Sequence, residues 1–282
     1  MSLLQAVLLG IVQGLTEFLP VSSTAHLYLA QVLLGIANDE VALSFDIVLH
    51  LGTAAALILA TWRELEAIVS EAFLWAGRRP ARHAVARALI LPIVVGTIPG
   101  VLAGLFLLKR FEAARTPALI GAAMLVACAF FFLAEAVAER RGSPDRPLSA
   151  LGSRDGLWIG VAQAAAGLLP GLSRSGFTIS TGRLRGFRRE DSARFSFLLA
   201  LPIILGAGAK ALLDLRKHGS AAVGPGALVA GFLASAVCGY LAVGYLLRFL
   251  RTRSLRPFAI YLGLLGLTLL ALSLSHEVPV VA

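Results

Sequence analysis

Two segments of the sequence are similar to each other, and the predicted fold depends on them. Residues 10–24 read GIVQGLTEFLPVSST and residues 160–174 read GVAQAAAGLLPGLSR. At an offset of 150 residues both contain the pattern Q-x5-LP-x2-S, which begins at Gln13 in the first segment. The shared pattern predicts an internal duplication, with one copy over about residues 1–140 and the second over about residues 150–282.

Each segment contains a short apolar stretch that stops at a proline. Residues 3–19 and 157–169 end before Pro20 and Pro170, and a turn rich in Ser, Thr or Gly follows each proline. The next apolar piece, TAHLYLAQVLLGI at 24–36, would form a helix of about 20 Å. Because a membrane-spanning helix must cross about 30 Å of hydrocarbon, we predict re-entrant hairpins made of two half-helices.

Composition defines the environment of the protein. The 282 residues are 58% hydrophobic and only 15% charged, and the mean hydropathy is +0.84. Ordinary globular chains contain about 25% charged residues, and a soluble chain of this length could not bury so much apolar surface. We therefore predict an all-α polytopic membrane protein that forms a single integral membrane domain over residues 1–282.

Six apolar stretches are long enough to cross a bilayer as helices. They are residues 42–62, 88–108, 117–138, 195–213, 221–247 and 257–275. Each copy of the duplication then has one re-entrant helical hairpin plus three transmembrane helices. Since three is odd, the second copy enters from the opposite side, which predicts an inverted-topology repeat.

The basic residues predict the orientation. Eighteen of the 25 lysines and arginines fall on one side of this topology and six on the other. The positive-inside rule places the eighteen in the cytoplasm and both termini outside. No basic residue precedes Arg63, so we expect the first apolar segment to remain in the mature protein. The net charge of +9 is explained by topology, and no nucleic-acid partner is expected.

Several charged residues near span ends have a simple interpretation. The arginines at positions 183, 185, 188 and 189 are expected to be topology signals beside anionic lipid headgroups. Glu135 is expected to extend its carboxylate toward the membrane surface. The predicted partners of these residues are therefore membrane lipids and water.

The two hairpins contain polar residues that are costly inside a membrane. In the first, Gln13 and Glu17 are four residues apart and share one helix face. The residues after the first break are Ser22, Ser23, Thr24 and His26, and those after the second are Ser173, Arg174, Ser175, Gly176 and Thr178. Each residue alone is compatible with a structural role, because Ser and Thr often bond back to helix carbonyls. As a set they indicate function.

The same residues suit a phosphate or diphosphate group. Each proline break is followed by a helix N-terminus, whose free N–H groups attract anions. Arg174 adds a fork of donors that matches phosphate oxygens. Glu17 would repel a bare phosphate, which leaves two solutions: a bridging divalent cation, or a buried ion pair between Glu17 and an arginine.

A further polar pair lies in the third helical segment. Asp46 and His50 are four residues apart, so they could bond each other or line the same cavity. The spacing is compatible with both arrangements.

These motifs resemble those of a known family. QGLTEFLPVSSTAH at 13–26 and LLPGLSRSGFT at 168–178 resemble the two signature motifs of the bacterial undecaprenyl-diphosphate phosphatases, the bacitracin-resistance family. FDIVLHLGT at 45–53 and FSFLLALPIILGA at 195–207 are similar to further stretches of it. The similarity runs along the whole chain with order and spacing kept.

The resemblance implies an integral enzyme of the bacterial inner membrane, multi-pass, with an active site that opens outward. It would hydrolyse undecaprenyl diphosphate to undecaprenyl phosphate, the recycled lipid carrier for peptidoglycan synthesis, with the help of Mg²⁺ or Ca²⁺. Glu17 would bind the cation. Two positions depart from the commonest pattern: Gln13 stands where many members have Glu, and Ala25 where Gly is usual. The first makes the metal site less certain.

The expected catalytic residues are Ser23, His26, Glu17 and Arg174. Ser23 would be the nucleophile and His26 its general base, or His26 would itself be the nucleophile. Arg174 would neutralise charge on the transferring phosphoryl group. The expected substrate-binding residues are Gln13, Ser22, Thr24, Ser173, Ser175, Gly176 and Thr178.

One competing function is compatible with the same features. A transporter or flippase for prenyl phosphates would also use inverted repeats, broken helices and an anion site at the midplane. The partner in either case is a polyprenyl lipid, and a homodimer remains a possibility that the sequence does not decide.

Overall fold

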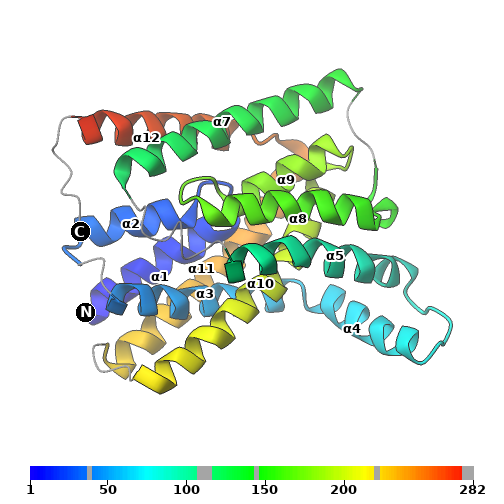
Figure 1. Cartoon of the computed structure of the whole chain (residues 1–282), viewed down its shortest axis with the longest axis horizontal. Coiled ribbons are helices and arrows are strands. Elements are labelled where there is room, and N and C mark those ends of the chain that lie inside the picture. Colours follow the sequence, from blue (N-terminus) through cyan, green and yellow to red (C-terminus); the bar gives the residue numbers. More distant parts are fainter. Residues whose placement is uncertain (37–39, 107–115, 143–145, 219–222, 275–282) are drawn as a thin grey trace.

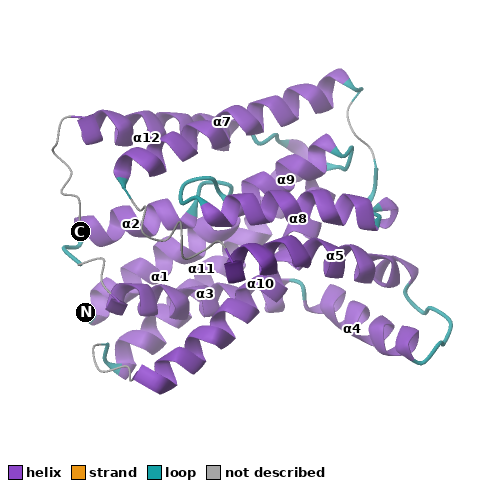
Figure 2. Ribbon diagram, in the orientation of Figure 1, coloured by secondary structure: helices purple, strands orange, loops and turns teal. Residues whose placement is uncertain are grey.

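The chain is built from helices. The computed structural model describes residues 1–36, 40–106, 116–142, 146–218 and 223–274. Its helices are α1 (Leu3–Phe18), α2 (Ser23–Leu33), α3 (Glu40–Ala60), α4 (Trp62–Ala76), α5 (Ala84–Phe106), α7 (Pro117–Arg140), α8 (Ser153–Leu168), α9 (Arg174–Leu184), α10 (Arg189–His218), α11 (Pro225–Thr252) and α12 (Arg256–Leu274), with a short 3-10 helix at Leu148–Ala150. These residues contain no strand, as Figure 2 shows, apart from one isolated bridge. The all-α prediction is confirmed.

The long apolar helices agree with the predicted spans. Within the described residues, α5, α7, α10, α11 and α12 are long and apolar enough to cross a membrane. The bent pair of α3 and α4 makes a sixth if it is counted as one span. The protein is therefore a multi-pass membrane protein.

One helix was not predicted. The basic segment after α3 was interpreted as a loop, but most of it forms α4, and the axis turns by 80° between the two helices. Glu71 on α4 is fully buried and accepts hydrogen bonds from the backbone N–H groups of Arg82 and His83 at 2.7 and 2.6 Å. This carboxylate fixes the connection from α4 to α5.

The two proline-broken segments form matching helix pairs. The helices α1 and α8 each have 16 residues, and α2 and α9 each have 11. The offset is 150 residues for α1 and α8 but 151 for α2 and α9. The second turn is longer by one residue, and it contains Gly171 at a φ of +105°. Ser22 therefore corresponds to Ser173, whereas the sequence pattern had aligned Ser23 with that residue.

The packing of the helices follows a reciprocal pattern. In Figure 1, α7 and α12 lie side by side along one edge, and they pack on each other. Helix α1 packs on α11 while α8 packs on α5, and α3 packs on both α10 and α11. Helices α1 and α8, which correspond at the offset of 150 residues, therefore each pack on a long helix from the other half of the chain.

Glycines permit close contacts within the α1–α11 and α5–α8 pairs. A Cβ atom on Gly10 of α1 would lie 2.6 Å from the carbonyl oxygen of Gly231 on α11. One on Gly160 of α8 would lie even closer to the carbonyl oxygen of Gly96 on α5. Since Gly10 and Gly160 are also aligned by the sequence pattern, the same residue type allows the same close approach in both pairs.

The prediction for Glu135 was wrong, and three of the arginines expected beside lipid headgroups also pair with buried carboxylates. Glu135 on α7 is fully buried and does not reach the membrane surface. It accepts hydrogen bonds from the side chain of Arg189 at 2.9 Å and from the backbone N–H of Leu255 at 3.0 Å, and Arg183 lies 3.5 Å away. Arg185 donates to Asp155 at 2.8 Å. These arginines hold helices together because buried carboxylates need partners.

Candidate active site

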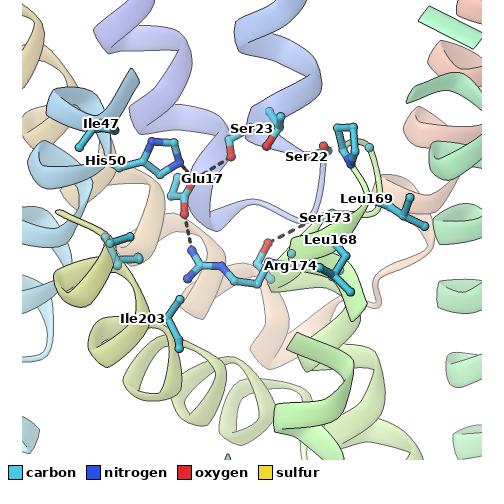
Figure 3. Close-up of a pocket in the computed structure, with 18 of the residues that line it drawn as sticks. Glu17, Ser22, Ser23, Ile47, His50, Leu168, Leu169, Ser173, Arg174 and Ile203 are labelled. Atoms are coloured by element: carbon cyan, nitrogen blue, oxygen red, sulfur yellow. Dashed lines mark hydrogen bonds and ion pairs between the residues drawn. The ribbon is translucent and has the colours of Figure 1, made fainter. Parts of the chain in front are cut away.

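A pocket lies where the two broken helix pairs meet. Its volume is about 330 Å³. The predicted residues that line it are Glu17, Ser22, Ser23 and Thr24 from the first pair and Ser173, Arg174 and Ser175 from the second. Figure 3 shows Glu17 and Arg174 extending toward each other across this space. The structure thus brings together residues that are about 150 positions apart in the chain.

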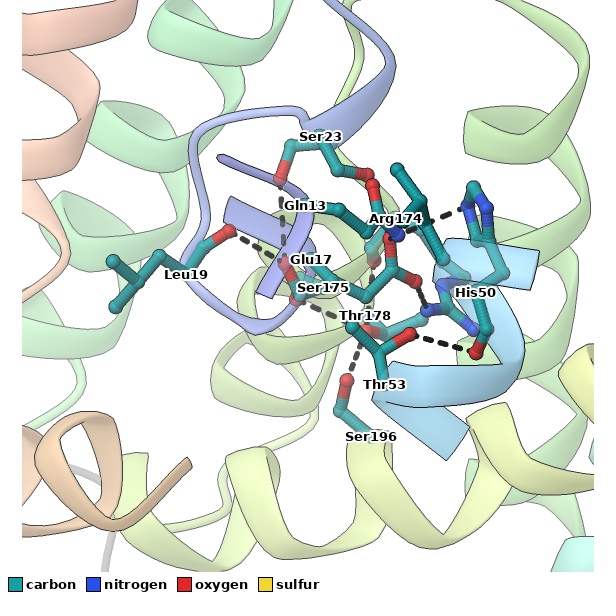
Figure 4. A network of polar contacts seen from close by, with 12 residues as sticks. Gln13, Glu17, Leu19, Ser23, His50, Thr53, Arg174, Ser175, Thr178 and Ser196 are labelled. Carbon is teal, nitrogen blue, oxygen red and sulfur yellow. Dashed lines mark hydrogen bonds and ion pairs between the residues drawn. The ribbon is translucent and has the colours of Figure 1, made fainter. Parts of the chain in front are cut away.

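The carboxylate of Glu17 is the centre of the polar network in Figure 4. Its Oε1 atom accepts from the guanidinium of Arg174 in an ion pair. Its Oε2 atom accepts from the hydroxyl of Ser23 at 2.6 Å and from the amide of Gln13 at 3.0 Å. Of the two solutions that the sequence left open, the structure contains the buried ion pair.

Both turns place a serine in an unusual backbone conformation. Ser22 has a φ of 69° and Ser173 a φ of 62°, which residues other than glycine seldom adopt. Each side chain caps the helix that follows, because Ser22 accepts from the N–H of Ala25 and Ser173 from that of Gly176. Such conformations gather at functional sites, where the surrounding structure maintains them.

His26 lies apart from this network. Its Nδ1 atom is 2.8 Å from the carbonyl oxygen of Ser22, and its Nε2 atom is 2.6 Å from the hydroxyl of Tyr261 on α12. The two rings are stacked with centroids 5.6 Å apart. Because a carbonyl oxygen only accepts, Nδ1 carries the hydrogen and Nε2 of the neutral ring accepts from Tyr261. In this arrangement the basic nitrogen faces α12, and Ser23 donates to Glu17.

Two other predicted residues lie beneath the pocket surface. Thr178 is fully buried, and its hydroxyl lies 2.9 Å from the carbonyl oxygen of Arg174 and 2.5 Å from the hydroxyl of Ser196. Gly176 packs against Phe131, whose ring occupies the space that a Cβ atom would need. Both residues hold α9 in position. The preceding residues Ser173, Arg174 and Ser175 line the pocket.

His50 is a pocket residue that the sequence analysis did not assign to the site. It lines the cavity, and its Nε2 atom is 3.5 Å from Oε2 of Glu17. Its Nδ1 atom is 2.7 Å from the backbone carbonyl of Asp46. The side chain of Asp46 instead accepts from Gln31 at 2.8 Å. Of the pair Asp46 and His50, the structure places His50 in the pocket wall, whereas the side chain of Asp46 bonds to Gln31.

The donors around Glu17 are compatible with a divalent cation. Gln13 is fully buried, and its Oε1 atom has no hydrogen-bond partner. A carboxylate with an unpartnered amide oxygen on the same helix face offers the oxygen ligands that Mg²⁺ and Ca²⁺ prefer. Within the described parts of the chain, no three His, Cys, Asp or Glu side chains gather into a metal site. Phosphate oxygens and water would supply further ligands.

The fold and the pocket define a class: a multi-pass membrane protein with a polar pocket between two broken helix pairs. Comparison with known proteins identifies the family. The family model described as bacitracin resistance protein BacA matches residues 6–268. This chain belongs to that family.

The names of similar proteins agree with this family assignment. The chain is 43% identical over 262 residues to the undecaprenyl-diphosphatase of Rubrobacter xylanophilus, which covers 93% of this chain and 94% of the relative. It is 42% identical to that of Desulforudis audaxviator, over 96% of this chain and 97% of the relative. It is 41% identical to that of Mycobacterium avium, over 94% of this chain and 95% of the relative.

Proposed function

We propose that this protein is an undecaprenyl-diphosphatase, a membrane hydrolase that converts undecaprenyl diphosphate to undecaprenyl phosphate and inorganic phosphate. The observation that carries the proposal is the contact of Glu17, Ser23 and Arg174 in one pocket formed by both broken helix pairs. Family membership and the names of the relatives support the same reaction. Its product is the lipid carrier of cell-wall synthesis, and its activity confers bacitracin resistance.

The residues of the pocket have distinct proposed roles in phosphoryl transfer. Ser23 is the nucleophile, and its hydrogen bond to Glu17 orients the hydroxyl. Arg174 balances the charge that develops on the phosphoryl group, in a reaction where positioning and electrostatics supply most of the catalysis. The hydroxyls of Ser22, Thr24, Ser173 and Ser175 line the space available to the diphosphate.

His26 must move to act on Ser23. As the base for Ser23 or as the nucleophile itself, the ring has to leave Tyr261 and turn toward the pocket. Either role therefore includes a side-chain rotation of His26.

A divalent cation is part of the proposal. Glu17 would hold it, assisted by the unpartnered Oε1 atom of Gln13. When bound, such an ion neutralises diphosphate charge and polarises the phosphoryl oxygens. This accounts for a carboxylate beside an anionic substrate.

The inverted repeat is also proposed rather than observed directly. The equal lengths of the paired helices, their shared cap conformation and the reciprocal packing support it. The distribution of arginines supports termini outside the cytoplasm, re-entrant helix pairs and a pocket that opens outward. The relatives' names favour hydrolysis over the transporter alternative, for which no separate observation exists.

The test is phosphate release from undecaprenyl diphosphate by purified protein in detergent. We expect the wild type to release phosphate and EDTA to inhibit this release. The variants Arg174→Ala and His26→Ala should release no phosphate. A folded, monodisperse wild type that releases no phosphate would contradict the proposal, and flux of prenyl phosphates in proteoliposomes would then be measured.

A further inference from the structure

The ring of His50 is held in one orientation by the helix that carries it. Its Nδ1 atom lies 2.7 Å from the carbonyl oxygen of Asp46, one turn earlier on α3. Since a carbonyl oxygen only accepts hydrogen bonds, Nδ1 must carry the hydrogen. In the neutral ring the lone pair is therefore on Nε2, the atom that faces Glu17 in the pocket.

This arrangement places two electron-rich atoms opposite each other. The Nε2 lone pair of His50 and the Oε2 atom of Glu17 are 3.5 Å apart. Two neighbouring ligands with bonds of about 2.2 Å to one octahedral ion, at an angle near 90°, are separated by about 3.1 Å, within a few tenths of an ångström of the distance in the structure. The spacing therefore fits two ligands that share one cation.

The two oxygens of Glu17 have separate partners. Arg174 binds Oε1, while Ser23, Gln13 and His50 all lie on the side of Oε2. Gln13 donates with its amide nitrogen, which leaves its buried Oε1 atom without a hydrogen-bond partner. A buried carbonyl oxygen without a partner is unfavourable, and a bound cation would supply that partner.

We propose that His50 is a nitrogen ligand of the divalent cation held by Glu17, with Gln13 as a further oxygen ligand. The inference rests on the cation of the proposed function and deepens it. An imidazole ligand favours borderline metals over Ca²⁺, which prefers an all-oxygen shell. The site therefore prefers Mn²⁺ to Ca²⁺, and His50 provides the preference.

Electron spin echo spectroscopy of bound Mn²⁺ tests this directly, because it detects a directly coordinated imidazole nitrogen. The sample is tag-free protein in detergent with Mn²⁺ and farnesyl methylenediphosphonate, which cannot be hydrolysed. We expect nitrogen coupling in the wild type and a changed pattern when histidine is labelled with ¹⁵N. The variant His50→Gln loses the coupling and binds Mn²⁺ roughly tenfold more weakly.

Two variants are matched controls. His26→Gln removes a ring whose nitrogens face Ser22 and Tyr261, and His83→Gln removes an exposed ring. Both retain the nitrogen coupling. Bound Mn²⁺ without nitrogen coupling in the wild type, no Mn²⁺ binding at all, or coupling that survives His50→Gln overturns the inference.

Phosphate release by the same wild-type preparation separates this inference from the proposed function. Release without nitrogen coupling overturns the role of His50 alone. Coupling without release of phosphate from undecaprenyl diphosphate supports the ligand and contradicts the hydrolase.

Discussion

The guanidinium of Arg174 on α9 forms an ion pair with the carboxylate of Glu17 on α1, across 157 positions of the chain. Both side chains are largely removed from solvent. The pair joins the two broken helix pairs at the pocket, so one contact serves both the fold and the proposed chemistry.

Arg174→Ala should affect stability and activity together. The Glu17 carboxylate would be left buried and unpaired, which costs about 3–5 kcal/mol. Loss of a donor that stabilises the transition state should reduce phosphate release about 10³-fold. Thermal unfolding in detergent and steady-state kinetics measure the two effects.

A double variant separates these effects. In Glu17→Gln/Arg174→Ala the buried charge is gone, so stability should recover while activity remains absent. Near-wild-type turnover in Arg174→Ala would show that the arginine is structural only.

The identity of the nucleophile predicts the chemistry of a trapped intermediate. With substrate labelled in its terminal phosphate, Ser23 as nucleophile gives a phosphoserine that survives acid and is lost in alkali. Phosphohistidine behaves in the opposite way. An acid-labile, alkali-stable label that disappears in His26→Ala would instead assign the nucleophile to His26.

Tyr261→Phe tests whether His26 has to leave α12. The change removes a hydroxyl that binds Nε2 at 2.6 Å and keeps the stacked ring. Loss of one hydrogen bond of about 1 kcal/mol should raise kcat by up to about fivefold if release of His26 limits turnover. Tyr240→Phe, on the exposed face of α11, is the control and should change nothing. A fall in kcat for Tyr261→Phe would mean that the tyrosine holds His26 in its working position.

The glycine contacts predict a contrast in stability. A Cβ atom on Gly10 would lie too close to the carbonyl oxygen of Gly231, so Gly10→Ala should cost about 1–3 kcal/mol. Gly160→Ala should behave in the same way against Gly96. Gly104 on α5 has open space around its Cβ position, so Gly104→Ala should be neutral or slightly stabilising. Unfolding midpoints in detergent compare the three, and equal midpoints would contradict the packing argument.

Much of this architecture follows from local features of the sequence. A proline after a short apolar stretch predicts a broken helix, and both breaks occur where Pro20 and Pro170 predict them. Glu17 and Arg174 were expected to meet because each is costly alone in a membrane. The long spans followed from length and hydropathy.

The rest depends on tertiary structure. Tyr261 is 235 positions from His26, so no spacing in the sequence could reveal their contact. The second turn is longer by one residue, and it contains Gly171 at a positive φ. The sequence pattern alone does not distinguish this glycine from one with an ordinary backbone conformation. The helix α4 was missed because its arginine-rich surroundings resemble a cytoplasmic loop.

Glu135 was misassigned because its place near the end of a predicted span suggested a surface position, and its burial leads to the last prediction. Its carboxylate joins α7 to Arg189 on α10 and to the backbone before α12, so one side chain connects three helices. Glu135→Gln should cost about 3–5 kcal/mol because the buried arginines lose their counter-charge. Glu139→Gln, which removes a half-exposed ion pair with Arg256, should cost less than about 1 kcal/mol. Unfolding in detergent compares the two variants, and equal losses would show that the burial of Glu135 contributes nothing beyond a surface ion pair.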